Sequence, residues 1–218
     1  MALLALLLVV AVAILFVTVG EVAFRRIGFN SFEYTLLLVG TLVGSSINIP
    51  VGVSRSTTPV VEIQTVRVFG FYYRVPRLSR AQVSTIIAVN VGGAVIPVLV
   101  VIYLLSGHPS LLAQAAAGSA IVAVLVHLMA RKVKGVGIVT PALLPPLAAA
   151  LVAYLLSPAS PAIVAYVSGT MGALIGADLS NLRGMADLGA PLASIGGAGT
   201  FDGVFLTGVV AVLLVPLL

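Results

Sequence analysis

Six polar side chains stand within or at the ends of strongly apolar segments of this sequence, and two of them are carboxylates. The six are Asn48, Asn90, His127, Thr140, Asp178 and Asp202. An ionised Asp inside a lipid bilayer costs roughly 3 kcal/mol, so embedded residues of this kind usually serve a function. The two aspartates are therefore the strongest candidates for chemistry in the chain.

Asp178 stands near the end of one apolar segment and Asp202 near the start of the next. Two antiparallel helices would bring these carboxyl groups face to face, where they would share a proton. One group could then act as a base on water and the other as an acid on a carbonyl, as in aspartic proteases. The same pair could carry a proton or bind a cation instead. In a third interpretation, each Asp only caps a helix.

The composition places these residues in a membrane protein. The chain is 61% hydrophobic and 8% charged, with a mean hydropathy of +1.25. Soluble domains are about 45–50% apolar and about 25% charged. The absence of Cys excludes disulfides and thiolate metal sites, and we expect neither a metal nor a cofactor. Loops beside membrane spans explain the net charge of +5 without nucleic acid.

A membrane-spanning helix needs about 20 apolar residues. Seven runs approach that length: 2–19, 32–53, 81–105, 111–130, 136–156, 162–182 and 198–218. The expected fold class is therefore all-α, a polytopic transmembrane bundle of about seven spans that forms one domain over 1–218. Pro141, Pro145 and Pro146 interrupt the fifth run, and glycines crowd the start of the seventh. We therefore expect one or two broken or re-entrant helices.

The basic residues predict the orientation in the cell membrane. Every Lys and Arg except Arg25 and Arg26 falls in the second, fourth or sixth loop. The positive-inside rule then puts the N-terminus in the cytoplasm and the C-terminus outside. The six polar residues would collect in the cytoplasmic half of the membrane.

The second loop, 54–80, is the only large extramembrane segment expected. Its stretch 60–75 (VVEIQTVRVFGFYYRV) alternates in polarity around Gly70, which predicts a short cytoplasmic β-hairpin. The hairpin would either lie on lipid headgroups through Arg67 and Arg74 or serve as a lid or docking edge.

Four blocks of sequence resemble a known family. They are GSSINIPV (44–51), AVNVGGAVIP (88–97), GTMGALIGADLSNL (169–182) and ASIGGAGTFDGVFLTG (193–208). Together they resemble a prokaryotic, largely archaeal family of multi-pass membrane proteins of unknown function. This resemblance implies a membrane protein and no particular activity.

A second resemblance concerns the last block. GAGTFDGVF (197–205) is similar to the glycine-x-glycine-aspartate motif of presenilins and signal peptide peptidases, with Asp202 in the catalytic position. Asp178 would be the partner aspartate, and PALL (141–144) resembles the proline-alanine-leucine motif of those proteases. In this chain PALL precedes both aspartates, whereas it follows them in those proteases.

The leading hypothesis is an intramembrane diaspartyl hydrolase acting on a transmembrane peptide, with Asp178 and Asp202 as its catalytic pair. The residues expected to contact substrate are Asn48, Asn90, Thr140, Pro141, Ala142, Leu143, Gly197, Gly199 and Asn181. The alternative is a transporter or channel that binds a small cation or a proton-coupled substrate with Asn48, Asn90 and the two aspartates. A lipid-binding scaffold is the third hypothesis. The lipid bilayer is the partner in all three.

Overall fold

The structure is a computed structural model that describes residues 2–133, 137–182, 192–197 and 203–218. The α-helices of these residues are α1 (Ala2–Arg26), α2 (Ser31–Gly44), α3 (Ile96–Gly107), α4 (Leu112–Met129), α5 (Leu144–Leu156), α6 (Pro161–Ala173) and α8 (Gly203–Leu214). The strands are β1 (Asn48–Val68), β2 (Phe71–Asn90), β3 (Arg131–Val133), β4 (Gly137–Val139) and β5 (Leu192–Ile195). Short 3₁₀ turns cover Pro109–Leu111, Leu179–Asn181 and Val215–Leu217.

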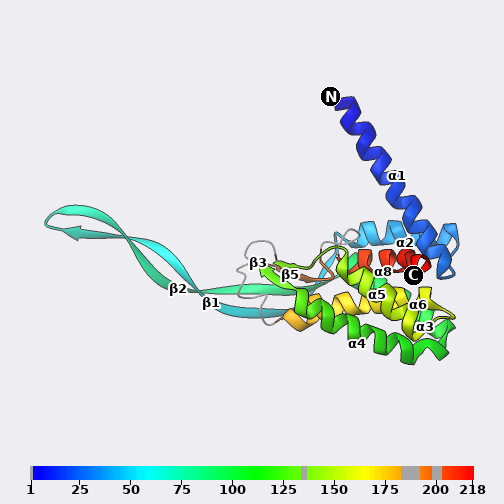
Figure 1. Cartoon of the computed structure of the whole chain (residues 1–218). Coiled ribbons are helices and arrows are strands. Elements are labelled where there is room, and N and C mark those ends of the chain that lie inside the picture. The colour runs from blue at the N-terminus through cyan, green and yellow to red at the C-terminus, as the bar shows by residue number, and fades with distance from the viewer. Residues whose placement is uncertain (1, 134–136, 183–191, 198–202) are drawn as a thin grey trace.

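The helix α6 forms the centre of the bundle and packs against α4, α5 and α8 (Figure 1). Small residues allow the close approach. A Cβ atom added to Gly172 would lie 2.5 Å from Val122, and one added to Gly176 would lie 2.4 Å from the Ala123 carbonyl oxygen of α4. The glycines of this segment therefore serve helix packing, as small residues commonly do between membrane helices.

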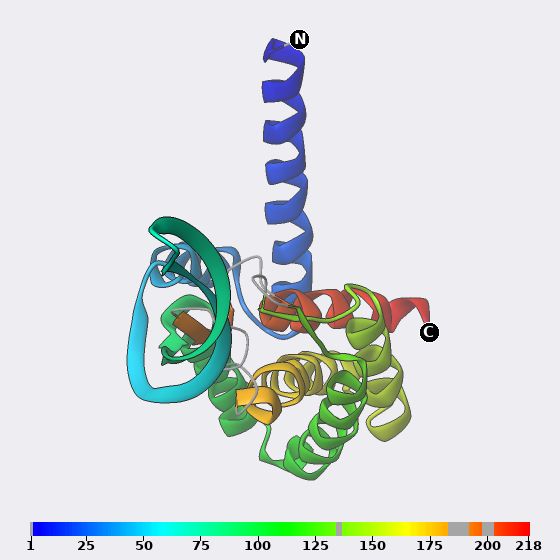
Figure 2. The same ribbon diagram turned by 90° about the vertical axis from the view of Figure 1, so that its left-hand side faces the viewer.

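The helix α1 packs on the bundle only through its C-terminal end. Phe24 is 1% exposed and stands among the aromatic rings of Phe29, Tyr34, Tyr166 and Phe205. The remainder of α1 leaves the bundle at a steep angle (Figures 1 and 2), and its apolar side chains are exposed. This exposed apolar surface suits contact with lipid.

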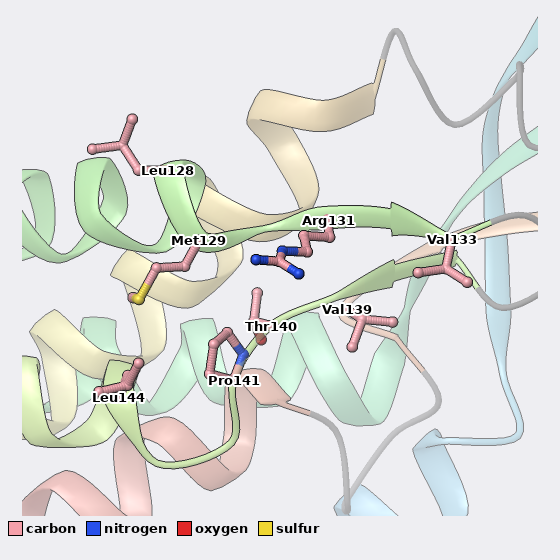
Figure 3. Close-up of a pocket in the computed structure, with 8 residues that line it drawn as sticks. All are labelled: Leu128, Met129, Arg131, Val133, Val139, Thr140, Pro141 and Leu144. Atoms are coloured by element: carbon pink, nitrogen blue, oxygen red, sulfur yellow. The ribbon is translucent and has the colours of Figure 1, made fainter.

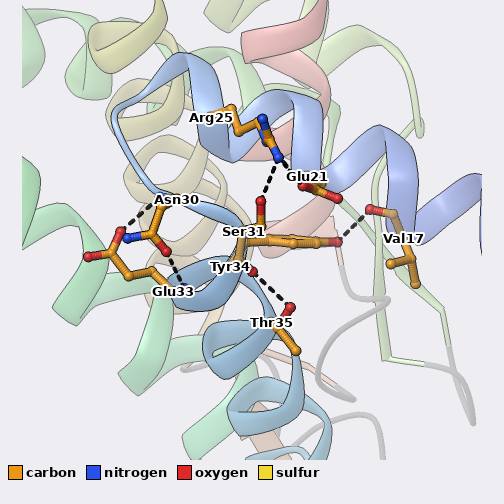
Figure 4. A network of polar contacts seen from close by, with 8 residues as sticks. All are labelled: Val17, Glu21, Arg25, Asn30, Ser31, Glu33, Tyr34 and Thr35. Atoms are coloured by element: carbon orange, nitrogen blue, oxygen red, sulfur yellow. Dashed lines mark hydrogen bonds and ion pairs between the residues drawn. The ribbon is translucent and has the colours of Figure 1, made fainter.

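A compact set of polar contacts fixes the turn between α1 and α2 (Figure 4). Asn30 and Glu33 form a capping box, in which each side chain accepts from the backbone N–H of the other, at 2.9 and 2.8 Å. The Tyr34 hydroxyl donates to the Val17 carbonyl across the turn, at 2.9 Å. The capping box satisfies two N–H groups at the start of α2 that would otherwise be unpaired, and the Tyr34 bond ties α2 to α1.

The chain is mostly helical, as predicted, but it is not purely all-α, because β1 and β2 form a long antiparallel hairpin that projects beyond the bundle (Figure 1). At about 3.3 Å per residue, its strands of about 20 residues reach about 65 Å. The turn lies at Phe69 and Gly70, as the sequence predicts, and both have positive φ, at 52° and 88°. β5 extends the sheet by pairing in parallel with Ile86–Val89 of β2.

Each of the seven predicted spans contains one described helix, but the second and third spans are much shorter than expected. The segments 48–53 and 81–90 belong to the hairpin, which therefore covers more than the predicted loop 54–80. Alternating apolar residues such as Val51, Val53, Ile87 and Val89 are typical of a strand, but beside a helical run their high apolar content resembles part of a membrane span. Three helical segments of the described chain are long and apolar enough to cross a membrane: Leu6–Arg26, Pro109–Met129 and Pro161–Asn181.

Two π-helical turns lie in the third and sixth predicted spans, whereas the sequence predicted irregular helices in the fifth and seventh. Val91–Val95 precedes α3 and begins directly after Asn90, whereas Leu174–Asp178 follows α6 and ends on Asp178. Single π-helical turns occur frequently at functional sites. The chain before α5 is also non-helical, and α5 begins at Leu144 with Pro145 and Pro146 in its first turn, where proline is tolerated.

Candidate active site around Asp178

Asp178 is a buried carboxylate whose position is fixed by a distant turn. The residue is 8% exposed. Its Oδ2 atom accepts a hydrogen bond of 2.7 Å from the backbone N–H of Gly196. The carboxylate makes no capping bond to the 3₁₀ turn Leu179–Asn181 that follows it. The interpretation of Asp178 as a helix cap is therefore wrong.

Asp178 lines a cavity of about 300 Å³. This volume is at the lower limit for a small-molecule or peptide pocket. The walls come from β4 and the segment after it, from the end of α6, and from the start of α8. The lining residues are Ile138, Val139, Thr140, Pro141, Ala142, Ala173, Ala177, Asp178, Gly203, Val204, Leu206 and Thr207. Asp178 is the only ionisable group among them.

The segment Thr140–Ala142 forms one wall of this cavity, as the proposed substrate-docking role requires. It continues from β4, which pairs with β3 on one side only among the described residues. Leu143 is 72% exposed and does not line the cavity. The structure therefore brings three of the four predicted residues of this segment next to Asp178.

Asn48 and Asn90 form a separate hydrogen-bond network. Asn90 is 1% exposed, and its Nδ2 donates to the Ser45 carbonyl at 2.8 Å and to Asn48 Oδ1 at 3.2 Å. Its Oδ1 accepts from the Gly93 N–H at 2.8 Å. Ser194 donates to Asn48 Oδ1 at 2.7 Å. Neither asparagine lines the Asp178 cavity.

The strand β5 and the turn after it connect the two polar regions. Ser194 of β5 bonds Asn48, and Gly196, two residues later, bonds Asp178. Gly196 has φ +83°, and an added Cβ would lie 2.6 Å from the backbone of Gly93 and Ala94. Only glycine fits this position, because both the backbone conformation and the space exclude a side chain. Gly197 follows with φ +56°.

Of the other predicted residues, Asn181 and His127 are described by the structure, whereas Asp202 and Gly199 are not. Asn181 is buried, and its Nδ2 donates to the Ala177 carbonyl of its own helical segment at 2.9 Å. His127 is exposed and bonds Ser180 at 2.7 Å. Asp202 and Gly199 lie outside the described residues. Gly203, which follows Asp202 in the sequence, lines the Asp178 cavity.

Sequence reasoning named Gly197 as a substrate contact, but it missed Ser194 and the hydrogen bond from Gly196 to Asp178. The Gly196–Gly197 pair is an ordinary turn signal, but nothing local shows that its N–H points at Asp178. Ser194 had no signal at all. The described residues contain no group of three or more His, Asp or Glu side chains that could hold a metal ion.

Comparison with known proteins agrees with the first resemblance. Residues 42–214 match the model of a family described as a protein of unknown function (DUF1614). The match covers most of the chain, so the protein belongs to this family. No curated protein matches, and no solved structure matches.

Proposed function

We propose that this DUF1614 protein is an intramembrane hydrolase that cleaves an extended peptide segment with Asp178 and Asp202 as its acid and base. The observation that carries the proposal is the fixed, buried carboxylate of Asp178 at the wall of a cavity. Buried carboxylates that face a cavity are characteristic of catalytic sites. The Gly196 N–H engages one carboxylate oxygen and thereby sets the direction of the other.

The second carboxyl group is assigned to Asp202. Gly203 stands at the same cavity as Asp178 and adjoins Asp202 in the chain. In the proposed reaction, one carboxylate takes a proton from water as the water oxygen attacks the peptide carbonyl carbon. The other carboxylic acid protonates the carbonyl oxygen. The C–N bond then breaks as the first carboxyl group gives its proton to the leaving amine and the second carboxylate takes a proton from a hydroxyl of the tetrahedral intermediate. The two carboxyl groups then regain their starting protonation state.

The part of the cavity wall formed by β4 supports an extended peptide as the substrate. Ile138 and Val139 supply apolar side chains, and the edge of β4 that pairs with no described strand offers backbone groups to which a peptide strand could pair. Pro141 has no N–H, so strand pairing would stop at this residue. The peptide would therefore meet Asp178 where β4 gives way to Thr140–Ala142.

The depth of Asp178 supports access of both water and a transmembrane substrate. It lies three residues before the end of the candidate span Pro161–Asn181. With the positive-inside rule, this end faces the cytoplasm. Water would reach the carboxyl pair from that side, and the peptide would enter from the bilayer.

The test is cleavage of a fluorogenic transmembrane peptide by the purified full-length protein in detergent or liposomes. We expect Asp178→Ala and Asp202→Ala each to abolish cleavage. Glu62→Gln is the matched control, because Glu62 is an exposed carboxylate on the hairpin. Activity that survives in both aspartate variants contradicts the proposal.

The irregular, π-helical turns that begin after Asn90 and end at Asp178 favour one competing function, transport of a cation or proton. Under that function the intact protein would carry an ion flux across liposomes that depends on Asp178, and it would not cleave peptides. The same preparation of protein and variants tests both functions.

A further inference from the structure

A second cavity shares three lining residues, Val139, Thr140 and Pro141, with the Asp178 cavity. Its volume is about 600 Å³, and it opens between the end of α4 and the chain from β4 to the start of α5. Leu128, Met129 and Leu144 form its apolar part, and Arg131 is its one charged side chain (Figure 3). The Arg131 guanidinium points into the cavity, toward Thr140 and Pro141.

Arg131 brings a positive charge to this cavity. Glu21 and Arg25 form the sole salt bridge among the described residues, so no described carboxylate neutralises Arg131. A guanidinium presents several N–H donors in a fork that matches the oxygens of a phosphate. The cavity is thus complementary to an anion that also carries apolar groups.

The position of Arg131 along the chain indicates that the anion is a lipid headgroup. Arg131 follows the candidate span Pro109–Met129 by two residues, which places it at the depth of the lipid headgroups. The apolar surface continues outward from the cavity over α4 and α5, where Leu128 is 75% exposed and Leu147 46% exposed. Acyl chains can lie on such a surface while a headgroup meets the guanidinium.

We propose that this cavity binds an anionic phospholipid, with the phosphate on Arg131 and the acyl chains along the outer faces of α4 and α5. Basic pockets between membrane helices on the cytoplasmic side commonly hold anionic headgroups. The site does not depend on the function proposed for Asp178. The lining of both cavities includes Val139, Thr140 and Pro141, so a bound lipid would contact residues that also border the Asp178 cavity.

The test compares phosphatidylglycerol with phosphatidylcholine of identical acyl chains, bound to the purified full-length protein and measured by native mass spectrometry. The wild-type protein should bind phosphatidylglycerol with a preference that falls roughly five- to tenfold in Arg131→Gln. Arg131→Lys should keep most of the preference, because the positive charge remains. Arg77→Gln is the matched control, since it removes the same charge from the exposed distal hairpin.

Three results would overturn the proposal. One is equal binding of the two lipids by the wild type, and another is an unchanged preference in Arg131→Gln. The third is full displacement of phosphatidylglycerol by millimolar inorganic phosphate, which would assign the site to a free anion. If Arg131→Gln does not fold, Arg131→Lys provides the test. Loss of the preference in this variant would contradict the assignment, because the positive charge is retained.

Discussion

Asn90 and Asp178 make the most instructive comparison in this molecule. Both are buried polar residues next to a π-helical turn, and both are tied to the β5 segment, through Asn48 and Ser194 in one case and through Gly196 in the other. The Asn90 side-chain amide forms hydrogen bonds with two backbone groups and with Asn48. It does not line the Asp178 cavity. Asp178 borders a cavity of about 300 Å³.

Under the proposed function, this difference separates a structural polar residue, Asn90, from a reactive one, Asp178. A buried amide that bonds the backbone on both sides lowers the free energy of the fold. A buried carboxylate beside a cavity has an oxygen positioned to meet a substrate. Depth in the membrane alone does not distinguish the two, because the sequence placed all six polar residues at a similar depth.

Replacement of Asp178 should give the largest effect. Asp178→Asn retains an oxygen that can accept from the Gly196 N–H, so the melting temperature should change little. Peptide cleavage should fall by about 10²- to 10⁴-fold, because an amide cannot act as an acid or base. Initial rates and thermal unfolding of the same preparation check both parts. If Asp178→Asn cleaves the peptide at the wild-type rate, Asp178 is a structural residue like Asn90.

Gly196→Ala should weaken both polar regions at once. The added methyl group would meet the backbone of Gly93 and Ala94 at 2.6 Å, in a backbone conformation that side chains rarely adopt. We expect a loss of about 3 kcal/mol in unfolding free energy. Gly28→Ala is the control, because Gly28 also has positive φ, at 101°, but has open space around its Cα. Equal losses in the two variants would show that the close contact at Gly196 is absent.

Asn90→Ala should destabilise the fold by about 2 kcal/mol, because it leaves the buried Gly93 N–H without its acceptor and the Ser45 carbonyl without its donor. Asn48→Ala should cost less, since Asn48 is exposed. Denaturation in mild detergent measures both losses. Cleavage by the folded fraction of Asn90→Ala should equal that of the wild type. A specific loss of cleavage without destabilisation would move Asn90 into the active site.

Shortening the hairpin should give the smallest effect. Replacing residues 57–82 with a two-residue Asn-Gly turn keeps the base of β1 and β2 and the pairing with β5. The change in unfolding free energy should stay within about 0.5 kcal/mol, as for surface changes in general. Thermal unfolding measures it. A much larger loss would show that the distal hairpin stabilises the bundle.

The sequence predicted the apolar helices and the Gly70 turn, because these depend on local composition and on turn chemistry. It did not predict the length of the hairpin, since an alternating run of valine and isoleucine next to a helix looks like part of a membrane span. The Ser194–Asn48 bond joins residues 146 positions apart. The sequence carries no local signal for such contacts, so the division between the Asn90 network and the Asp178 cavity required the structure.

The pairing of Asp178 with Asp202 can be measured by cysteine cross-linking, because the natural chain contains no Cys. In the double variant Asp178→Cys, Asp202→Cys, mild oxidation in membranes should form an intramolecular disulfide, which requires Cα atoms within about 7 Å. The pair Asp178→Cys, Glu62→Cys should form none, since Glu62 lies on the distal hairpin. Efficient cross-linking of the aspartate positions alone is the predicted result. A folded double variant that forms no cross-link would contradict the assignment of these two residues to one active site.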